Sequence, residues 1–114
     1  MIYDGDWIDD ARNGHGYLVF ADGRTYNGQW KDSKKHGTGK FIWTNGDYYY
    51  GDWKDGFRTG RGIYQFKDGR LKDALWKDDK EEGLHKITYA DGTIEYSKWQ
   101  SGKKGDVFED MNEV

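Results

Sequence analysis

Three histidines and many carboxylates are the side chains of this sequence that could bind a metal or transfer protons. His15, His36 and His85 are the candidate imidazole ligands, but they occupy three different positions of the repeating pattern described below. A metal site built by a repeated unit would place its ligands at equivalent positions. We therefore predict no metal site.

Catalytic residues and cofactors are not predicted either. Asp22, Asp68 and Asp91 each precede a glycine, where Asp stabilises a turn through its own backbone. A paired-carboxylate site needs a concave pocket to shift a pKa, and the sequence has no non-repeating insertion to build one. No serine or threonine lies in a nucleophile-elbow context, and no strand–glycine-loop–helix unit offers a phosphate cradle. The sequence predicts a protein that is not an enzyme.

A step of 23 residues organises the chain. Three kinds of marker keep this step: tryptophans, glycines that end a Gly-x-Gly segment, and turn pairs of Asp or Asn with Gly. The tryptophans are Trp7, Trp30, Trp53, Trp76 and Trp99, the glycines are Gly16, Gly39 and Gly62 with His85 in the fourth place, and the turns are Asp22-Gly23, Asn45-Gly46, Asp68-Gly69 and Asp91-Gly92. A fixed period with independent markers predicts a repeat architecture.

The composition predicts a thin structure. Aromatic residues make up 18% of the 114 residues, hydrophobic residues of all kinds only 34%, and there is no proline. Large rings with polar tips therefore supply most of the apolar area, and we expect them on one face instead of in a deep interior.

Several classes of protein are disfavoured. The absence of cysteine excludes disulfides and thiolate metal sites. No apolar run approaches 18 residues, and the first residues lack the basic and apolar segments of a secretory signal. The net charge of −3 argues against general nucleic-acid binding. We expect a cytoplasmic protein, or one held peripherally at a membrane or the cytoskeleton.

The second copy predicts how the strands pair. Residues 39–43 and 49–53 alternate as strands do, with the hairpin signal Asn45-Gly46 between them. A two-residue turn would pair Phe41 with Tyr50 and divide the markers between two faces. A three-residue loop over residues 44–46 pairs Phe41 with Tyr49 and collects every marker on one face, so we prefer it. The facing glycines would then leave a trough for a neighbouring ring.

The motif Tyr26-Asn27-Gly28-Gln29-Trp30, followed by His36-Gly37-Thr38-Gly39 and Asn45-Gly46, resembles the MORN repeat (membrane occupation and recognition nexus). The resemblance covers nearly all of residues 3–99. It implies an all-β fold: successive antiparallel β-hairpins that form one elongated, twisted, single-layer sheet with an aromatic groove. It also implies non-catalytic roles, such as scaffolding, docking of a helix or peptide, binding of acidic phospholipids, or self-association.

The predicted array of about four to five repeats covers residues 3–105, with copies at 3–25, 26–48, 49–71, 72–94 and a partial copy at 95–105. An acidic C-terminal tail is expected at 106–114. Copies four and five depart from the pattern, since Lys72 replaces a tyrosine and His85 a glycine.

We expect the aromatic face to be the interaction site, because some rings of a single-layer sheet must stay uncovered. Ten or so strands about 4.8 Å apart would give a groove on the order of 45 Å long. The competing interpretation is that the rings only hold the sheet together. We expect it to apply mostly to the tryptophans of the Tyr-x-Gly-x-Trp motif, such as Trp30 and Trp53, whereas Phe20, Trp43, Phe66, Tyr48 and Tyr64 cannot all be covered. The candidate groove residues are Phe20, Tyr26, Trp30, Phe41, Trp43, Tyr48, Tyr49, Trp53, Tyr64 and Phe66.

Basic residues are in excess in the two middle copies, and acidic residues in excess at both ends. They form either a solvated mixed surface or a patch that faces an anionic partner. The candidate patch is Lys31, Lys34, Lys35, Lys54, Arg58 and Arg61.

The leading hypothesis is a non-enzymatic protein–protein interaction module, acting as adaptor, scaffold or inhibitor, that binds a partner helix or peptide. The alternative is weak peripheral binding of acidic phospholipid through basic loops of the central repeats. Carbohydrate stacking is a third hypothesis, supported only by the number of rings. Open edge strands also predict self-association through the terminal repeats.

Overall fold

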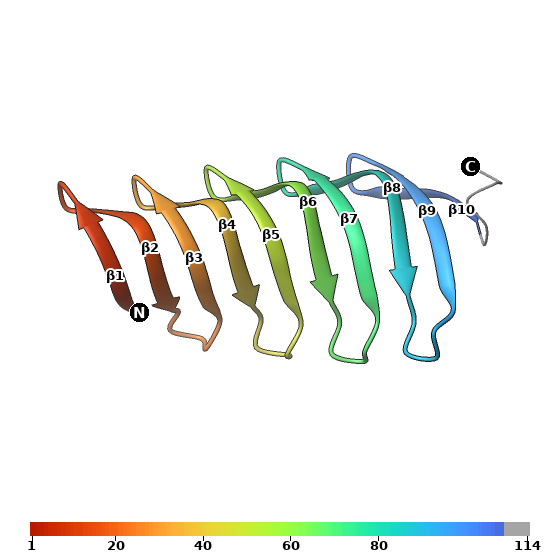
Figure 1. The fold of residues 1–114 in the computed structure, drawn as a ribbon, viewed down its shortest axis with the longest axis horizontal. Coiled ribbons are helices and arrows are strands. Elements are labelled where there is room, and N and C mark those ends of the chain that lie inside the picture. The colour runs from red at the N-terminus through yellow and green to blue at the C-terminus, as the bar shows by residue number, and fades with distance from the viewer. Residues whose placement is uncertain (109–114) are drawn as a thin grey trace.

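The computed structural model describes residues 1–108 and contains one layer of ten antiparallel strands in chain order (Figure 1). Its extents are 51 × 24 × 18 Å. The described residues contain no helix long and apolar enough to cross a membrane. The predicted all-β, single-sheet fold is confirmed. The strands are β1 (Ile2–Ile8), β2 (Ala11–Val19), β3 (Thr25–Lys31), β4 (Lys34–Ile42), β5 (Tyr48–Lys54), β6 (Phe57–Gln65), β7 (Leu71–Lys77), β8 (Lys80–Thr88), β9 (Ile94–Gln100) and β10 (Lys103–Phe108).

The two faces of the sheet differ because side chains alternate along each strand. In β3, for example, Tyr26, Gly28 and Trp30 are buried while the residues between them are exposed. We call the buried side the aromatic face. Its core consists of Leu18, Tyr26, Trp30, Phe41, Tyr49, Trp53, Ala74 and Trp76.

The predicted three-residue loop between β4 and β5 is confirmed. Phe41 pairs with Tyr49 and Gly39 with Gly51. The Trp43 amide donates to the Asp47 carbonyl at 2.9 Å, which encloses residues 44–46. Gly46 has φ 96°, a backbone conformation that glycine adopts without steric cost.

A second, tighter hairpin turn joins β3 to β4 and recurs in each copy. Its two central residues both have positive φ, as in a type I′ turn. The first of them also keeps the step of 23, with φ between 48° and 51°: Asp9, Asp32, Asp55, Asp78 and Ser101. The sequence therefore marks this turn with the same period as the tryptophans.

A tyrosine lies over each facing pair of glycines. Gly28 pairs with Gly39, and a Cβ built on Gly39 would collide with the hydroxyl end of Tyr26. The Tyr26 hydroxyl donates to the Gln29 carbonyl at 2.9 Å. The predicted trough therefore exists, and the ring that fills it comes from the same hairpin.

The divergent copies keep their hairpins, since β7 pairs with β8 and β9 with β10. Strand β10 runs to Phe108 and so includes residues 106–108, which we had assigned to the tail. The remainder of the predicted acidic tail lies outside the described residues.

Replacing Gly39 with alanine should lower the free energy of unfolding by about 1–3 kcal/mol, because the new methyl group overpacks the trough under Tyr26. Urea unfolding followed by tryptophan fluorescence measures this. The matched control is Thr38→Ala on the neighbouring exposed residue, which should change stability by about 0.5 kcal/mol or less. Equal effects of the two substitutions would contradict the packing argument.

Candidate functional site

Half of the predicted groove residues are core residues. Tyr26, Trp30, Phe41, Tyr49 and Trp53 have exposed fractions of 6% or less. Their rings are covered by neighbouring rings, so they stabilise the sheet and leave little surface for a partner. For these five residues the structural interpretation describes the geometry better than the groove interpretation.

Edge-to-face packing covers them. The Tyr26 ring lies 5.0 Å from Trp30 in its own repeat and 5.6 Å from Trp53 in the next, at 82° and 89°. The Trp53 indole also donates to the Gly39 carbonyl at 3.1 Å, as Trp30 does to Gly16. Each tryptophan thereby joins its own repeat to the preceding one.

Tyr48 lies on the opposite face, because it immediately precedes the buried Tyr49 in β5. There its hydroxyl donates to Gln65 at 2.5 Å and its ring contacts the Lys40 ammonium group. Tyr48 therefore does not belong with the other predicted groove residues.

The remaining four predicted rings are half-buried on the aromatic face: Phe20, Trp43, Tyr64 and Phe66. They form a row along the loop-side margin of the core, with Trp43 lying 5.2 Å from Tyr64 and Tyr64 4.8 Å from Phe66. The Tyr64 hydroxyl donates to Asp47 at 2.9 Å. Burial, aided by that bond, raises the pKa of Tyr64 to about 12. These partly accessible rings are the candidate contact surface.

A second row on this face consists of cations stacked on the core tryptophans. Arg12 lies over Trp30 at 4.7 Å and Lys35 over Trp53 at 5.1 Å. Burial is the main cause that lowers the pKa of Lys35. Arg12 was missed by the sequence argument, although it precedes Lys35 by the repeat step of 23.

The six predicted patch residues are not in one place. Lys35 and Arg58 lie on the aromatic face, with Arg58 4.0 Å from the Trp76 ring. Arg61 alternates to the opposite face, 3.7 Å from Asp73. The exposed Lys31, Lys34 and Lys54 flank the tight turns, where Asp32 and Asp55 alternate with them in sequence.

In the fourth copy two substitutions exchange the contents of the trough. His85 replaces the second glycine and is completely buried. Its Nε2 lies 3.0 Å from the Leu75 carbonyl, the counterpart of the carbonyl that receives the Tyr26 hydroxyl. Lys72, in the tyrosine position, instead pairs with Glu81 and lies 3.9 Å over the Trp99 ring. In this copy the imidazole of His85, on β8, fills the trough. In the earlier copies a tyrosine on the preceding strand of the hairpin fills it.

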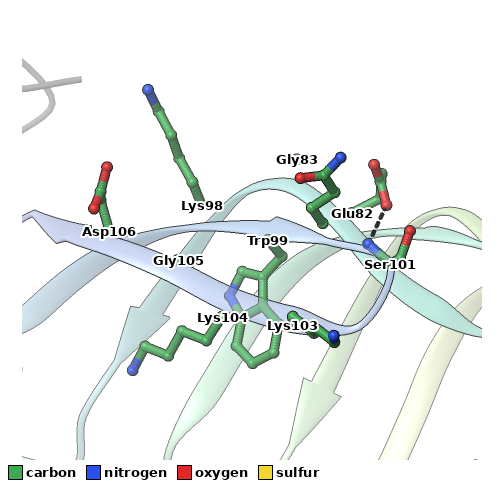
Figure 2. Close-up of a pocket in the computed structure, with 10 residues that line it drawn as sticks. Glu82, Gly83, Lys98, Trp99, Ser101, Lys103, Lys104, Gly105 and Asp106 are labelled. Carbon is green, nitrogen blue, oxygen red and sulfur yellow. Dashed lines mark hydrogen bonds between the residues drawn. The ribbon is translucent and has the colours of Figure 1, made fainter.

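No group of three or more metal-binding side chains occurs among residues 1–108. An open hollow of about 760 Å³ lies near β9 and β10 (Figure 2). Its lining includes Glu82, Lys98, Trp99 and Asp106. Two smaller hollows on the aromatic face are more relevant, because they combine the half-buried rings with the cations.

Exchanging the fourth-copy pair back to the repeat pattern should show strong coupling. His85→Gly alone should cost about 2–5 kcal/mol by emptying the trough, and Lys72→Tyr alone about 1–3 kcal/mol because two side chains then compete for it. All four proteins of the cycle carry Ala74→Gly, because Ala74 stands at the position of Gly28, where a Cβ would collide with the tyrosine hydroxyl. The double variant should then cost less than the sum, since tyrosine refills the space. Urea unfolding of all four proteins completes the cycle, and additive costs would contradict the exchange.

Stability should fall as pH decreases through the histidine range. Burial is the largest cause that lowers the pKa of His85 below its ordinary 6.5, against opposing effects from the Leu75 carbonyl and Glu81. The unfolded chain therefore takes up a proton at a higher pH than the folded chain does, and stability is lost once pH drops below about 6.5. Urea unfolding at about pH 7.5 and about pH 5.5 measures the decrease. His85→Gln should reduce it, whereas exposed His15→Gln should not.

Comparison with protein families finds a match to the MORN repeat at residues 3–23, 26–48, 49–69 and 74–94. Among curated proteins, none matches this chain. The four matched segments are consecutive and include most of the sequence. Together with the ten-stranded meander and the tyrosine over paired glycines, they show that the chain belongs to the MORN-repeat family.

Proposed function

We propose that this protein is a non-enzymatic protein–protein interaction module that binds an acidic, amphipathic helix or peptide along the aromatic face. The observation that carries the proposal is a pair of equivalent hollows on that face. Membership of a family whose repeats generally serve as protein or membrane interaction modules supports it. In this role the protein would act as an adaptor, a scaffold or an inhibitor.

The two hollows are the same site, two repeats apart. The first, of about 220 Å³, is lined by Arg12, Leu18, Phe20, Trp30 and Lys35 among others. The second, of about 250 Å³, is lined by Arg58, Tyr64, Phe66, Trp76, Glu81 and Lys72. Each member of the first group has its counterpart 46 residues later in the second, although Glu81 stands there in the position of Lys35. The array therefore repeats one small apolar and charged hollow along its length.

The spacing defines the partner. Two repeats span four strands, or about 19 Å. Apolar anchors that reach both hollows would be about 13 residues apart on a helix and about six apart on an extended peptide.

The charges favour an acidic partner. Arg12 and Lys35 border the first hollow. Arg58 and Lys72 border the second, where Glu81 pairs with Lys72, so the first hollow carries the larger positive charge. These cations are at least partly buried and stacked on rings, so their positions are fixed before binding. Complementary charge mainly improves association rate and specificity.

Acidic phospholipid is the less favoured ligand. The exposed Lys31, Lys34 and Lys54 share the tight-turn edge, which would suit a membrane surface. Asp32 and Asp55 lie among them in sequence, however, and would offset much of their attraction.

A displayed library of random helical and extended peptides, selected on the wild-type protein, tests the proposal. Selected peptides should contain acidic residues and two apolar anchors at one of the stated spacings. Their affinity should fall at least about tenfold with Phe66→Ala or Arg58→Glu, because each contributes an anchor worth about 1.4 kcal/mol or more. Circular dichroism checks that each variant remains folded.

The matched control is Tyr50→Ala, which removes an exposed ring from the opposite face. Peptides that bind Phe66→Ala normally and lose affinity for Tyr50→Ala would place the site on the face opposite the aromatic face and contradict the proposal. Binding of the protein to vesicles of acidic phospholipid, with no peptides selected, would favour the lipid alternative.

A further inference from the structure

A three-residue contact recurs at three of the four boundaries between repeats within residues 1–108. Its fullest form joins Arg58 of one repeat to Trp76 and Asp79 of the following one. The guanidinium lies 4.0 Å over the indole and 2.5 Å from the Asp79 carboxylate. The backbone completes the contact, because the Asp79 amide donates to the Arg58 carbonyl at 2.9 Å.

The same contact occurs one and two repeats earlier with other side chains. Arg12 lies over Trp30, and the Ser33 amide donates to the Arg12 carbonyl at 2.9 Å. Lys35 lies over Trp53, and the Gly56 amide donates to the Lys35 carbonyl, also at 2.9 Å. At these three boundaries the contact consists of a cation on the even-numbered strand, and a tryptophan and a tight turn on the strand that follows. At the fourth boundary Glu81 occupies the cation position, its carbonyl accepts from the Gly102 amide at 2.9 Å, and Lys72 lies over Trp99 instead.

The two edges of the sheet carry the separate halves of one more such contact. On β10, Lys104 is at the position of Arg58, two repeat steps later. On β1 and its turn, Trp7 and Asp10 are at the positions of Trp76 and Asp79, three steps earlier. Trp7 is 56% exposed, whereas Trp30, Trp53 and Trp76 are buried. Within residues 1–108, β1 pairs only with β2 and β10 only with β9.

We propose that a second copy of this chain docks head to tail, with Lys104 of one copy over Trp7 of the next and paired with its Asp10 carboxylate. The proposal is independent of the peptide site described above, because it uses the edges of the sheet. Such a contact joins two different surfaces and does not close on itself, so it generates linear oligomers.

Charge selects this pairing over the two symmetric ones. Strand β1 and its turn carry Asp4, Asp6, Asp9 and Asp10 and no basic residue. The tight-turn end of β10 carries Lys103 and Lys104. Joining two β1 edges would oppose four carboxylates to four, and joining two β10 edges would oppose lysines, whereas the unlike edges attract.

The docking surface is confined to the tight-turn half of β10. Lys104 faces Trp99 in register, but Val107 takes the place opposite Ser97 that the repeat step assigns to Phe108. The backbone beyond Lys104 is therefore one residue out of repeat register. In Figure 2, Lys104 and the Trp99 ring project on one side of β9 and β10, and Lys98 and Asp106 on the other. The Lys104 ammonium lies 3.2 Å from Glu95 and would exchange or share that partner on docking.

Analytical ultracentrifugation of the 114-residue chain over a wide concentration range tests the proposal. The weight-average sedimentation coefficient should rise with concentration, and less so at high salt. Lys104→Glu and Asp10→Lys should each abolish the rise, since each opposes like charges. Mixing these two variants should restore it, because the two contact positions of unlike variants again carry opposite charges.

Lys103→Glu is the matched control. It makes the same charge change one residue away, at a position that faces Gln100 instead of Trp99, and should leave most of the association intact. If circular dichroism shows that Asp10→Lys is unfolded, Asp10→Asn takes its place, because asparagine tolerates a positive φ. Asp10→Asn should weaken association. A monomer at every concentration, equal effects of Lys103→Glu and Lys104→Glu, or failure of mixing to restore association would overturn the proposal.

Discussion

The structure depends on a ring that replaces two missing side chains. Where two glycines face each other across a hairpin, as Gly28 and Gly39 do, a tyrosine two residues before the first glycine lies over both. The tyrosine hydroxyl donates to the backbone carbonyl three residues after the tyrosine itself. A single-layer sheet has no second layer to cover its core. The tyrosine provides that cover from within the sheet, and the tryptophan of the next repeat packs against its edge.

The fourth copy shows that volume and hydrogen bonding matter more there than residue identity. Lysine in the tyrosine position would leave the trough empty, but His85 fills it from the facing strand and reaches the equivalent carbonyl. The lysine then turns to Glu81 and the Trp99 ring. Lysine in the tyrosine position is therefore one of two linked substitutions, and histidine in the glycine position is the other. This explains why β7 and β8 keep the hairpin geometry of the earlier copies.

The same packing determines which surface remains for other molecules. Rings that join successive repeats are buried by that role, and only the rings along the loop-side margin stay partly accessible. Cations at the first three boundaries between repeats stack on the core tryptophans. Because these boundaries are built alike, a small hollow recurs on the aromatic face, and β1 and β10 carry the parts of one further boundary.

The sequence alone determined the fold class, the register of the long-loop hairpins and the facing glycines, because a strict period and strand alternation constrain which residues share a face. It did not determine how completely the core rings are covered: Tyr26, Phe41 and Tyr49 were candidates for the groove, yet neighbouring rings bury them. Nor did it show that Lys35 stacks on an indole, because that indole, Trp53, belongs to the following repeat. Burial and charge pairing arise between repeats, from residues a full period apart, and so they were decided by the tertiary structure.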